Sequence, residues 1–384
     1  MTRAGIYIHI PFCRSRCSYC DFATGMYESA LAKRYVAAVI SEINNWHEVN
    51  EPRRIDTIYF GGGTPSLLSP AQIELILKAV RSRFEVVENP EVTLEINPGD
   101  GGTTPASKES NLRRLLELGV NRASFGAQTF DDRELKQLGR THDSADISIT
   151  FQQLRNAGFE NINFDLIAGL PGQTLKGWQR NLDAALKLQP EHLSLYLLDV
   201  HEGTPLADQI NRGMRPRPDD DVAAEMYAMM IAQVCSAGYE HYEISNFCLP
   251  GFESEHNTKY WSGDPYYGFG CSAHSFDGRR CRWANERDAM KYVAMIENAE
   301  SPVVERTDLQ EEDARSESIF LGLRLMRGVD LRSYRVRFGD DLRDRYDGEL
   351  GRLVEAGLIE IAGDMLRLTT RGALLSNEVF AALA

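Results

Sequence analysis

Three of the chain's seven cysteines lie within eight positions of one another, in the segment PFCRSRCSYCDF at residues 11–22. Cys13, Cys17 and Cys20 have the spacing C-x3-C-x2-C, and Phe22 stands where a fourth cysteine could follow. The odd total and the uneven clustering do not favour a disulfide framework. In a reducing compartment, such a cluster indicates metal binding or catalysis.

Residue chemistry alone leaves three interpretations of these thiols. They could be unrelated buried thiols, although their density argues against this. They could hold zinc, which takes four nitrogen or sulfur ligands, with His9 as the fourth ligand, but His9 falls in a segment with the pattern of a strand. They could instead hold a [4Fe–4S] cluster, which normally takes four Cys ligands. Three ligands would leave one iron open, as a catalytic metal site requires.

A glycine-rich segment, FGGGTPS at residues 60–66, follows a predicted strand. The glycines at 61–63 could serve only a tight turn. They could also let the backbone approach a ligand closely, because βα proteins place their sites at the carboxyl ends of strands. We favour the second interpretation.

Four further polar residues fall at related places in the predicted elements. Glu95, Gln128 and Asp165 lie at or near strand ends, and Arg140 lies where a helix would start. A carboxylate such as Glu95 could accept hydrogen bonds from ribose hydroxyls or from an ammonium group. Each residue alone could be a surface or capping residue, but together they occupy corresponding edges of successive strands.

The segment HNTKYW at residues 256–261 combines a possible haem-iron ligand with two aromatic residues. His256 could ligate iron, and Tyr260 and Trp261 could lie against a porphyrin face. Equally, His256 could be a hydrogen-bonded loop residue beside an aromatic core pair. Among the remaining cysteines, Cys271 could be a thiolate near haem but is expected to be an inert buried thiol. We interpret Cys235, Cys248 and Cys281 as structural.

The elements that must position these residues alternate between strands and helices over the first half of the chain. Apolar runs indicate six strands, each followed by a helical pattern, which predicts consecutive βα units with a parallel sheet. A closed barrel needs eight units, so the prediction is an open, partial (βα)6 barrel resembling a TIM barrel. The six expected strands cover residues 5–10, 56–60, 91–97, 121–127, 161–167 and 192–198.

The rhythm changes after residue 200, and three domains are predicted. Residues 1–200 form the partial barrel with the cysteine loop, 201–310 an α+β accessory region with the HNTKYW motif, and 311–384 a winged-helix-like domain. Winged helices often bind DNA, but basic and acidic residues are balanced here, which favours a packing module.

Composition sets further limits. The chain has 384 residues and a formal net charge of −14, which disfavours a general nucleic-acid binder. No run of about 18 apolar residues suggests a membrane span, and the first residues lack the apolar core of a signal peptide. We therefore expect a cytoplasmic protein that binds neither nucleic acid nor membrane.

The stretch IYIHIPFCRSRCSYCDF resembles the signature of radical S-adenosylmethionine (SAM) enzymes, with Tyr19 as the aromatic residue before the last cysteine. In that family SAM chelates the open iron of a [4Fe–4S] cluster, and an electron from the cluster cleaves SAM to a 5′-deoxyadenosyl radical. The family fold, a partial (βα)6 barrel, agrees with the strand count. The resemblance implies cluster ligands at Cys13, Cys17 and Cys20. It implies SAM contacts from Tyr7, Gly62, Gly63, Thr64, Glu95, Gln128, Arg140 and Asp165.

Nearly the whole chain is similar to the coproporphyrinogen III oxidase-like branch, which contains the oxygen-independent oxidase and the HemW-type haem chaperones. The oxidase carries another cysteine where this chain has Phe22, and it has an N-terminal extension, whereas Tyr7 is almost at the start here. The H-N-x-x-Y-W pattern is typical of the chaperones and implies haem at His256. The resemblance thus implies haem, haem-accepting proteins and a flavodoxin- or ferredoxin-like electron donor as partners. Decarboxylation of coproporphyrinogen III is the alternative, so enzyme activity stays open.

Overall fold

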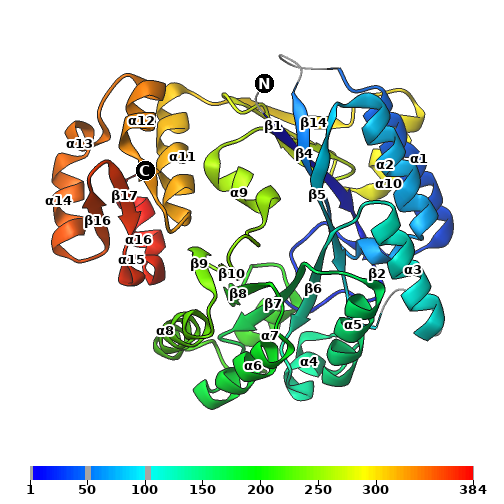
Figure 1. Cartoon of the computed structure of the whole chain (residues 1–384), viewed down its shortest axis with the longest axis horizontal. Coiled ribbons are helices and arrows are strands. Elements are labelled where there is room, and N and C mark those ends of the chain that lie inside the picture. Colours follow the sequence, from blue (N-terminus) through cyan, green and yellow to red (C-terminus); the bar gives the residue numbers. More distant parts are fainter. Residues whose placement is uncertain (1–2, 48–52, 100–104, 384) are drawn as a thin grey trace.

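The parallel core predicted from the sequence is present in the computed structural model, which describes residues 3–47, 53–99 and 105–383. Six neighbouring parallel strands follow chain order, and their apolar residues are buried, as expected for a parallel sheet covered on both faces. The sheet curves without closing (Figure 1), which confirms the partial (βα)6 barrel. The strands are β1 (Arg3–Ile10), β4 (Arg54–Gly62), β5 (Val86–Ile96), β6 (Arg122–Gln128), β7 (Ile162–Ala168) and β8 (His192–Leu197).

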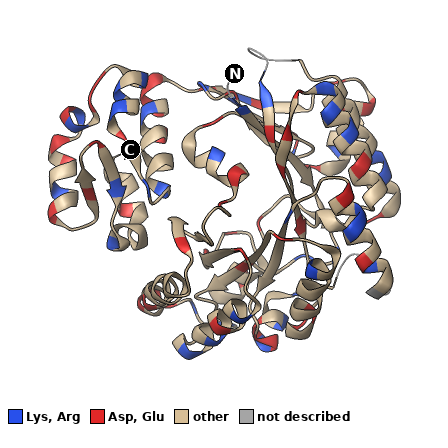
Figure 2. Ribbon diagram, viewed as in Figure 1, with Lys and Arg blue, Asp and Glu red and all other residues tan. Residues whose placement is uncertain are grey.

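Helices cover the outer face of this curve (Figure 1), and Lys, Arg, Asp and Glu are spread along them (Figure 2). Helix α2 shows how local sequence fixes a boundary: Ser69 caps it by accepting from the Gln72 amide, Gln72 bonds back to Ser69, and Pro70 occupies the first turn. The covering helices are α1 (Ser29–Asn44), α2 (Pro70–Arg83), α3 (Pro105–Glu117), α4 (Asp132–Leu138), α5 (Ser144–Ala157) and α6 (Leu175–Leu188), with the 3₁₀ turn η1 (Pro65–Leu67) after β4.

Residues 201–310 extend the same sheet at both edges. Strand β11 (Tyr266–Phe269) pairs in parallel with β1, and β12 (His274–Phe276), β13 (Cys281–Asn285) and β14 (Val303–Asp308) continue outward from it. At the other edge, β10 (Asn246–Cys248) pairs with β8, and β9 (Glu240–Glu243) follows. The helices of this part are α7 (Pro205–Asn211), α8 (Asp220–Ser236), α9 (Glu255–Ser262) and α10 (Ala289–Glu297). The division at residue 200 stays a prediction, and it falls just after β8, the last of the six parallel strands that follow chain order.

Helix α9 lies inside the curve of the sheet rather than outside it (Figure 1). The carboxylate of Glu91 accepts the backbone amides of Glu255 and His256 at 3.0 Å each. The ammonium group of Lys259 forms a buried ion pair with Asp56 at 2.8 Å. These contacts hold α9 against β4 and β5.

The C-terminal part combines helices with a three-stranded antiparallel sheet ordered β15–β17–β16, in keeping with a winged-helix-like module. Two short helices follow one another in this part, and they are separated at Tyr346, which leaves helical backbone angles (φ −117°, ψ 26°). The elements are α11 (Glu311–Arg324), β15 (Val329–Asp330), α12 (Leu331–Phe338), α13 (Leu342–Arg345), α14 (Asp347–Glu355), β16 (Ile359–Ala362), β17 (Met365–Leu368), α15 (Thr370–Leu374) and α16 (Ser376–Ala382).

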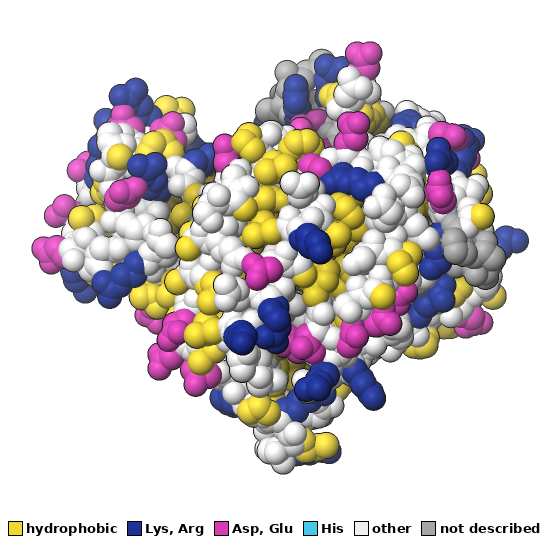
Figure 3. Space-filling model, turned by 60° about the horizontal axis from the view of Figure 1, so that its bottom comes forward, with side chains coloured by type: hydrophobic (Ala, Val, Ile, Leu, Met, Phe, Trp, Pro, Cys, Tyr) yellow, Lys and Arg dark blue, Asp and Glu magenta, His cyan; other side chains and the backbone are white. Residues whose placement is uncertain are grey.

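The surface mixes charges of both signs. On the face shown in Figure 3, basic and acidic side chains are interspersed among hydrophobic ones. A nucleic-acid-binding surface is typically a continuous basic patch that meets the phosphate backbone, and the described residues on this face form no such patch. Within the described residues, no helix is long and apolar enough to cross a membrane.

Candidate cluster and cofactor site

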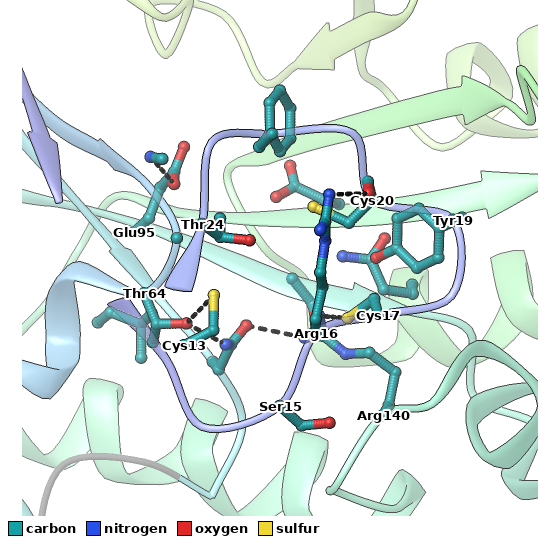
Figure 4. Close-up of a pocket in the computed structure, with 18 of the residues that line it drawn as sticks. Cys13, Ser15, Arg16, Cys17, Tyr19, Cys20, Thr24, Thr64, Glu95 and Arg140 are labelled. Atoms are coloured by element: carbon teal, nitrogen blue, oxygen red, sulfur yellow. Dashed lines mark hydrogen bonds between the residues drawn. The ribbon is translucent and has the colours of Figure 1, made fainter. Parts of the chain in front are cut away.

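The three clustered cysteines lie on the loop that follows β1. The loop begins with β2 (Phe12–Cys13), which pairs with β3 (Gly25–Met26). Its middle is tied to the barrel where the Ser18 amide donates to the carbonyl of Leu138 at 2.9 Å. All three thiols are free and partly buried, and they line one cavity of about 140 Å³ (Figure 4). The structure thus brings Cys13, Cys17 and Cys20 to the mouth of the barrel.

Two hydrogen-bond donors point at the sulfur atoms. The hydroxyl of Thr64 lies 3.7 Å from Cys13 Sγ, and Arg140 Nη1 lies 3.3 Å from Cys17 Sγ (Figure 4). Asn97 joins these donors: its Nδ2 donates to Thr64 Oγ1 at 2.7 Å, and its Oδ1 accepts from Arg140 Nη2 at 2.8 Å. Hydrogen bonds to ligand sulfurs tune iron–sulfur centres, so this arrangement suits thiolate ligands.

Burial changes the acidity of the thiols. Desolvation raises the pKa of Cys13 to about 11, with a partly opposing hydrogen bond from Thr64. It also raises the pKa of Cys20. Without a cation, these two sulfurs would stay protonated at neutral pH. A bound metal centre deprotonates coordinating thiols, so a metal centre that binds here would displace the protons of these two thiols.

The donor set fits a cluster better than a single zinc ion. Zinc ligands all lie about 2.0–2.3 Å from one ion, and among the described residues no three His, Cys, Asp or Glu side chains converge in that way. His9 is not free to be a fourth ligand, because its Nδ1 bonds Tyr7 and its Nε2 bonds the Ala23 carbonyl, each at 3.0 Å. An all-sulfur set of three around a cavity suits a [4Fe–4S] cluster with one open iron.

The glycine-rich segment closes one side of the cavity. Gly62 has φ +111°, and a Cβ there would meet the His9 ring at 2.5 Å. A Cβ on Gly63 would lie 2.7 Å from the Phe12 carbonyl oxygen. These glycines therefore let β4 pack directly on the cysteine loop, which adds a structural reason to the predicted ligand approach. Gly62, Gly63 and Thr64 all line the cavity.

Glu95 faces the cysteines from β5 (Figure 4). Its Oε1 accepts from the Tyr59 hydroxyl at 2.9 Å, and its Oε2 accepts from the Gly62 amide at 3.0 Å. Burial is the main reason that its pKa is raised to about 7, and the charge of Asp165 adds to the shift. A carboxyl group near its midpoint at neutral pH can take up a cationic ligand group by releasing its proton.

The other predicted polar residues complete the same wall. Gln128 ends β6 with φ +66°, an uncommon angle for a residue with a side chain. Asp165 lies in the middle of β7 rather than at its end; burial raises its pKa, and Asn163 donates to its Oδ1 at 2.7 Å. Arg140 follows the C-cap of α4 instead of starting a helix. All three line the cavity, because neighbouring parallel strands and their following loops share one barrel end.

Tyr7 is not part of this cavity. Its hydroxyl bonds His9, and its ring lies 6.1 Å from the Tyr59 ring. Tyr7 instead lines a second, more open cavity on the other side of Phe22, and Phe22 lines both cavities. Its predicted contact with SAM stays a prediction that this geometry does not support.

His256 belongs to the region predicted as an accessory to the barrel, and the structure places it against the barrel strands β1 and β4. His256 is fully buried inside the curve of the sheet. Its Nδ1 lies 2.8 Å from Thr57 Oγ1 on β4, and its Nε2 lies 2.8 Å from the Tyr260 hydroxyl. Burial lowers its pKa to about 3, so the ring is neutral. Both ring nitrogens are therefore in use, and neither faces a cavity.

The aromatic residues of the same motif point in two other directions. Tyr260 reaches the second cavity. Trp261 packs at the junction with the C-terminal part, where the Arg324 guanidinium lies 4.3 Å from its ring centre and pairs with the buried Glu243 at 2.8 Å. The motif thus connects the barrel interior, a cavity wall and α11.

Sequence reasoning missed Asn97, which joins the donors to two cysteine sulfurs. Its position two residues after Glu95, at the end of the same strand, was the available signal. Four cysteines lie outside the loop. Three of them, Cys248, Cys271 and Cys281, are buried, in agreement with the expected structural role, whereas Cys235 is exposed. Tyr35 donates to Cys271 Sγ at 3.4 Å.

An open βα sheet with a three-cysteine loop after its first strand is the architecture of a radical SAM protein. Residues 7–185 match the model of the radical SAM superfamily, and residues 309–375 match that of the HemN C-terminal domain. The solved coproporphyrinogen III oxidase (HemN) from Escherichia coli superposes with a TM-score of 0.84 at 24% identity, covering 100% of this chain and 90% of that one. At that identity the likeness shows the fold.

Sequence comparison is more specific. The heme chaperone HemW of Bacillus subtilis is 37% identical over 98% of both chains. The heme chaperone HemW of Escherichia coli is 32% identical and covers 97% of this chain and 96% of its own. A mitochondrial radical S-adenosyl methionine domain-containing protein 1 from Bos taurus is 40% identical over 71% of this chain. The chain belongs to the HemW family of the radical SAM superfamily.

Proposed function

We propose that this protein is a haem chaperone that binds haem and delivers it to acceptor proteins, with a [4Fe–4S] cluster and SAM as its resident cofactors. The observation that carries the proposal is the 37% identity to a heme chaperone over 98% of both chains. Such coverage includes the cysteine loop, the HNTKYW motif and the C-terminal part, so the whole architecture is shared.

The cluster would be held by Cys13, Cys17 and Cys20, with Thr64 and Arg140 donating to two of the sulfurs. SAM would lie across the cavity between these thiols and Glu95, whose carboxylate suits an ammonium group. The cavity wall around SAM would include Gly62, Gly63, Gln128 and Asp165. When bound, cluster and SAM supply one-electron chemistry, and a small flavodoxin- or ferredoxin-like protein would be the electron donor.

The residue after the cysteine loop separates this proposal from its alternative, decarboxylation of coproporphyrinogen III. Phe22 stands where the oxidase resembled by the sequence carries another cysteine, and its ring is 62% exposed beside the cluster cavity. An exposed aromatic ring cannot ligate iron or exchange protons as a thiol can. It does offer an apolar face to a planar ligand.

A cytoplasmic location is part of the proposal. All seven cysteines are free thiols in the structure, which suits a reducing compartment. Haem-accepting proteins of the same compartment would be the partners. The formal charge of −14 favours acceptors with basic docking surfaces.

The test uses the anaerobically reconstituted protein with its cluster. Haem titration should give one tightly bound haem per chain, and mixing with a haem-free acceptor protein should transfer it. In parallel, coproporphyrinogen III with SAM and a reductant should yield no protoporphyrinogen. If the protein decarboxylates coproporphyrinogen III over multiple turnovers and does not bind haem stably, the proposed chaperone function is wrong and the oxidase function is correct.

A further inference from the structure

The second cavity has the shape and lining of a site for a flat aromatic ligand. Its volume is about 400 Å³, within the roughly 300–1,000 Å³ typical of small-molecule sites. It is open to solvent, and its lining includes four aromatic side chains, two histidines and one arginine. These residues are Tyr7, His9, Phe22, Tyr260, Tyr266, His274 and Arg287, and His274 is the exposed one of the two histidines.

His274 differs from the other histidines at this end of the barrel in being available. It is exposed on β12, and among the described residues its ring has no hydrogen-bond partner. His9 and His256, by contrast, are buried with both ring nitrogens bonded. A neutral imidazole with a free nitrogen at a cavity is a common haem-iron ligand.

The charges at the rim suit a carboxylate-bearing ligand. The exposed guanidinium of Arg287 also lines the cavity, and its Nη2 donates to the Asp21 carbonyl at 2.8 Å, which fixes it at the edge of the cysteine loop. Its remaining N–H groups can pair with a carboxylate. The Asp21 side chain is the other charged group in the lining, and its Oδ2 lies 3.9 Å from His201 Nε2.

The buried motif explains how one wall is held rigid. The Tyr260 hydroxyl lies 2.8 Å from His256 Nε2, and the Tyr260 ring packs edge-on to Tyr266 with 4.6 Å between the ring centres. Tyr266 in turn accepts from Arg282 Nη1 at 3.0 Å. His256 is therefore a positioning residue for the cavity wall, at a distance from any ligand in the cavity.

We infer that this second cavity binds haem, with His274 as the axial iron ligand, Arg287 pairing with a propionate and the four aromatic rings covering the porphyrin. The inference rests on the proposed function and moves the iron ligand from His256 to His274. It also places the ligand against Phe22, the side chain shared with the cluster cavity.

The test titrates haem into cluster-loaded wild-type protein and into the variants His274→Ala, Arg287→Ala and His47→Ala. Difference spectra against cluster-loaded protein isolate the Soret band. His47 is an exposed histidine outside the lining of this cavity and serves as the matched control. We expect His274→Ala to shift the Soret band and weaken haem at least tenfold, with added imidazole restoring the wild-type spectrum. Arg287→Ala should weaken haem binding about two- to fivefold without the spectral shift, as for one exposed charged pair.

The outcomes separate this site from the function on which it rests. Wild-type protein that takes up no haem would refute both. Wild-type binding with unchanged affinity and spectrum in His274→Ala would refute the site and leave the chaperone function standing. Iron–sulfide content and SAM affinity should stay at wild-type values in both variants, and their loss in His274→Ala would mean that this residue supports the fold instead.

Discussion

The cluster cavity and helix α9 both carry residue types that could bind a cofactor, and they differ in whether those residues are available. Cys13, Cys17 and Cys20 are partly exposed and share a cavity, and Thr64 and Arg140 donate to two of their sulfurs. His256 is fully buried, and each ring nitrogen has a partner. A residue that could ligate a metal does so only if its lone pair faces open space. The predictions below test this contrast in order of decreasing effect.

Replacing Cys13, Cys17 and Cys20 together by alanine should remove all bound iron and sulfide and leave the fold intact. The thiols lie at the barrel mouth, whereas the apolar strands provide most of the burial. Iron content and circular dichroism measure the two effects, and Cys235→Ala on α8 is the matched control. Stoichiometric iron–sulfide in the triple variant would remove the loop from the cluster site.

His256→Ala should act mainly on stability. It leaves the Thr57 and Tyr260 hydroxyls without a partner and opens a cavity inside the sheet, at a cost of about 2–4 kcal/mol in unfolding free energy. Denaturant unfolding measures the change. Asn257→Ala, in the same helix and only partly buried, should stay close to wild type.

A second measurement on His256→Ala sharpens the comparison. Cluster content should be unchanged, and haem affinity should fall only as far as Tyr260 loses its fixed position. A stable variant whose haem spectrum reports a lost axial ligand would return the iron ligand to His256.

Glu95→Gln should lower the affinity for SAM roughly tenfold or more. This is the effect of losing a hydrogen bond to a charged group, which contributes about 1.5–3 kcal/mol. The binding should also change with pH. The pKa of Glu95 is about 7 in the free protein, raised mainly by burial, and only its ionised form attracts an ammonium. Affinity for SAM should therefore fall as pH drops below about 7, and calorimetry across this range measures it.

The same titration on the variants gives the control. Glu95→Gln should flatten the pH dependence. Asp165→Asn should weaken SAM binding less and shift the dependence to lower pH, because the charge of Asp165 helps to raise the pKa of Glu95. A pH profile unchanged in Glu95→Gln would assign the proton to another group.

Asn97→Ala should have the smallest effect. It removes the two hydrogen bonds that join Thr64 and Arg140, and Arg140 keeps its bond to the Gly126 carbonyl at 2.7 Å. We expect the binding free energy of SAM to fall by about 1 kcal/mol, which is a severalfold loss of affinity, while the cluster content stays at the wild-type value. Loss of the cluster itself would show that Asn97 holds the loop, beyond orienting donors.

Sequence by itself predicted the architecture and pointed to the cysteine loop. Hydrophobic periodicity predicted the six parallel strands with boundaries within a few residues, and cysteine spacing singled out the loop after the first strand, because both are local signals carried by neighbouring residues. The start of α2 is also a local signal, because Ser69 is a favoured N-cap residue and Pro70 suits the first helical turn.

Tertiary structure alone decided which polar residues face a cavity. Nothing in HNTKYW says that α9 folds into the sheet, where Thr57, Asp56 and Glu91, from strands more than 160 positions away, take up its polar groups. Nor does the sequence reveal that His274 is exposed, whereas His9 and His256 are buried with both ring nitrogens hydrogen-bonded. Availability of a side chain depends on long-range packing and on partners far along the chain, and periodicity and spacing carry no record of either.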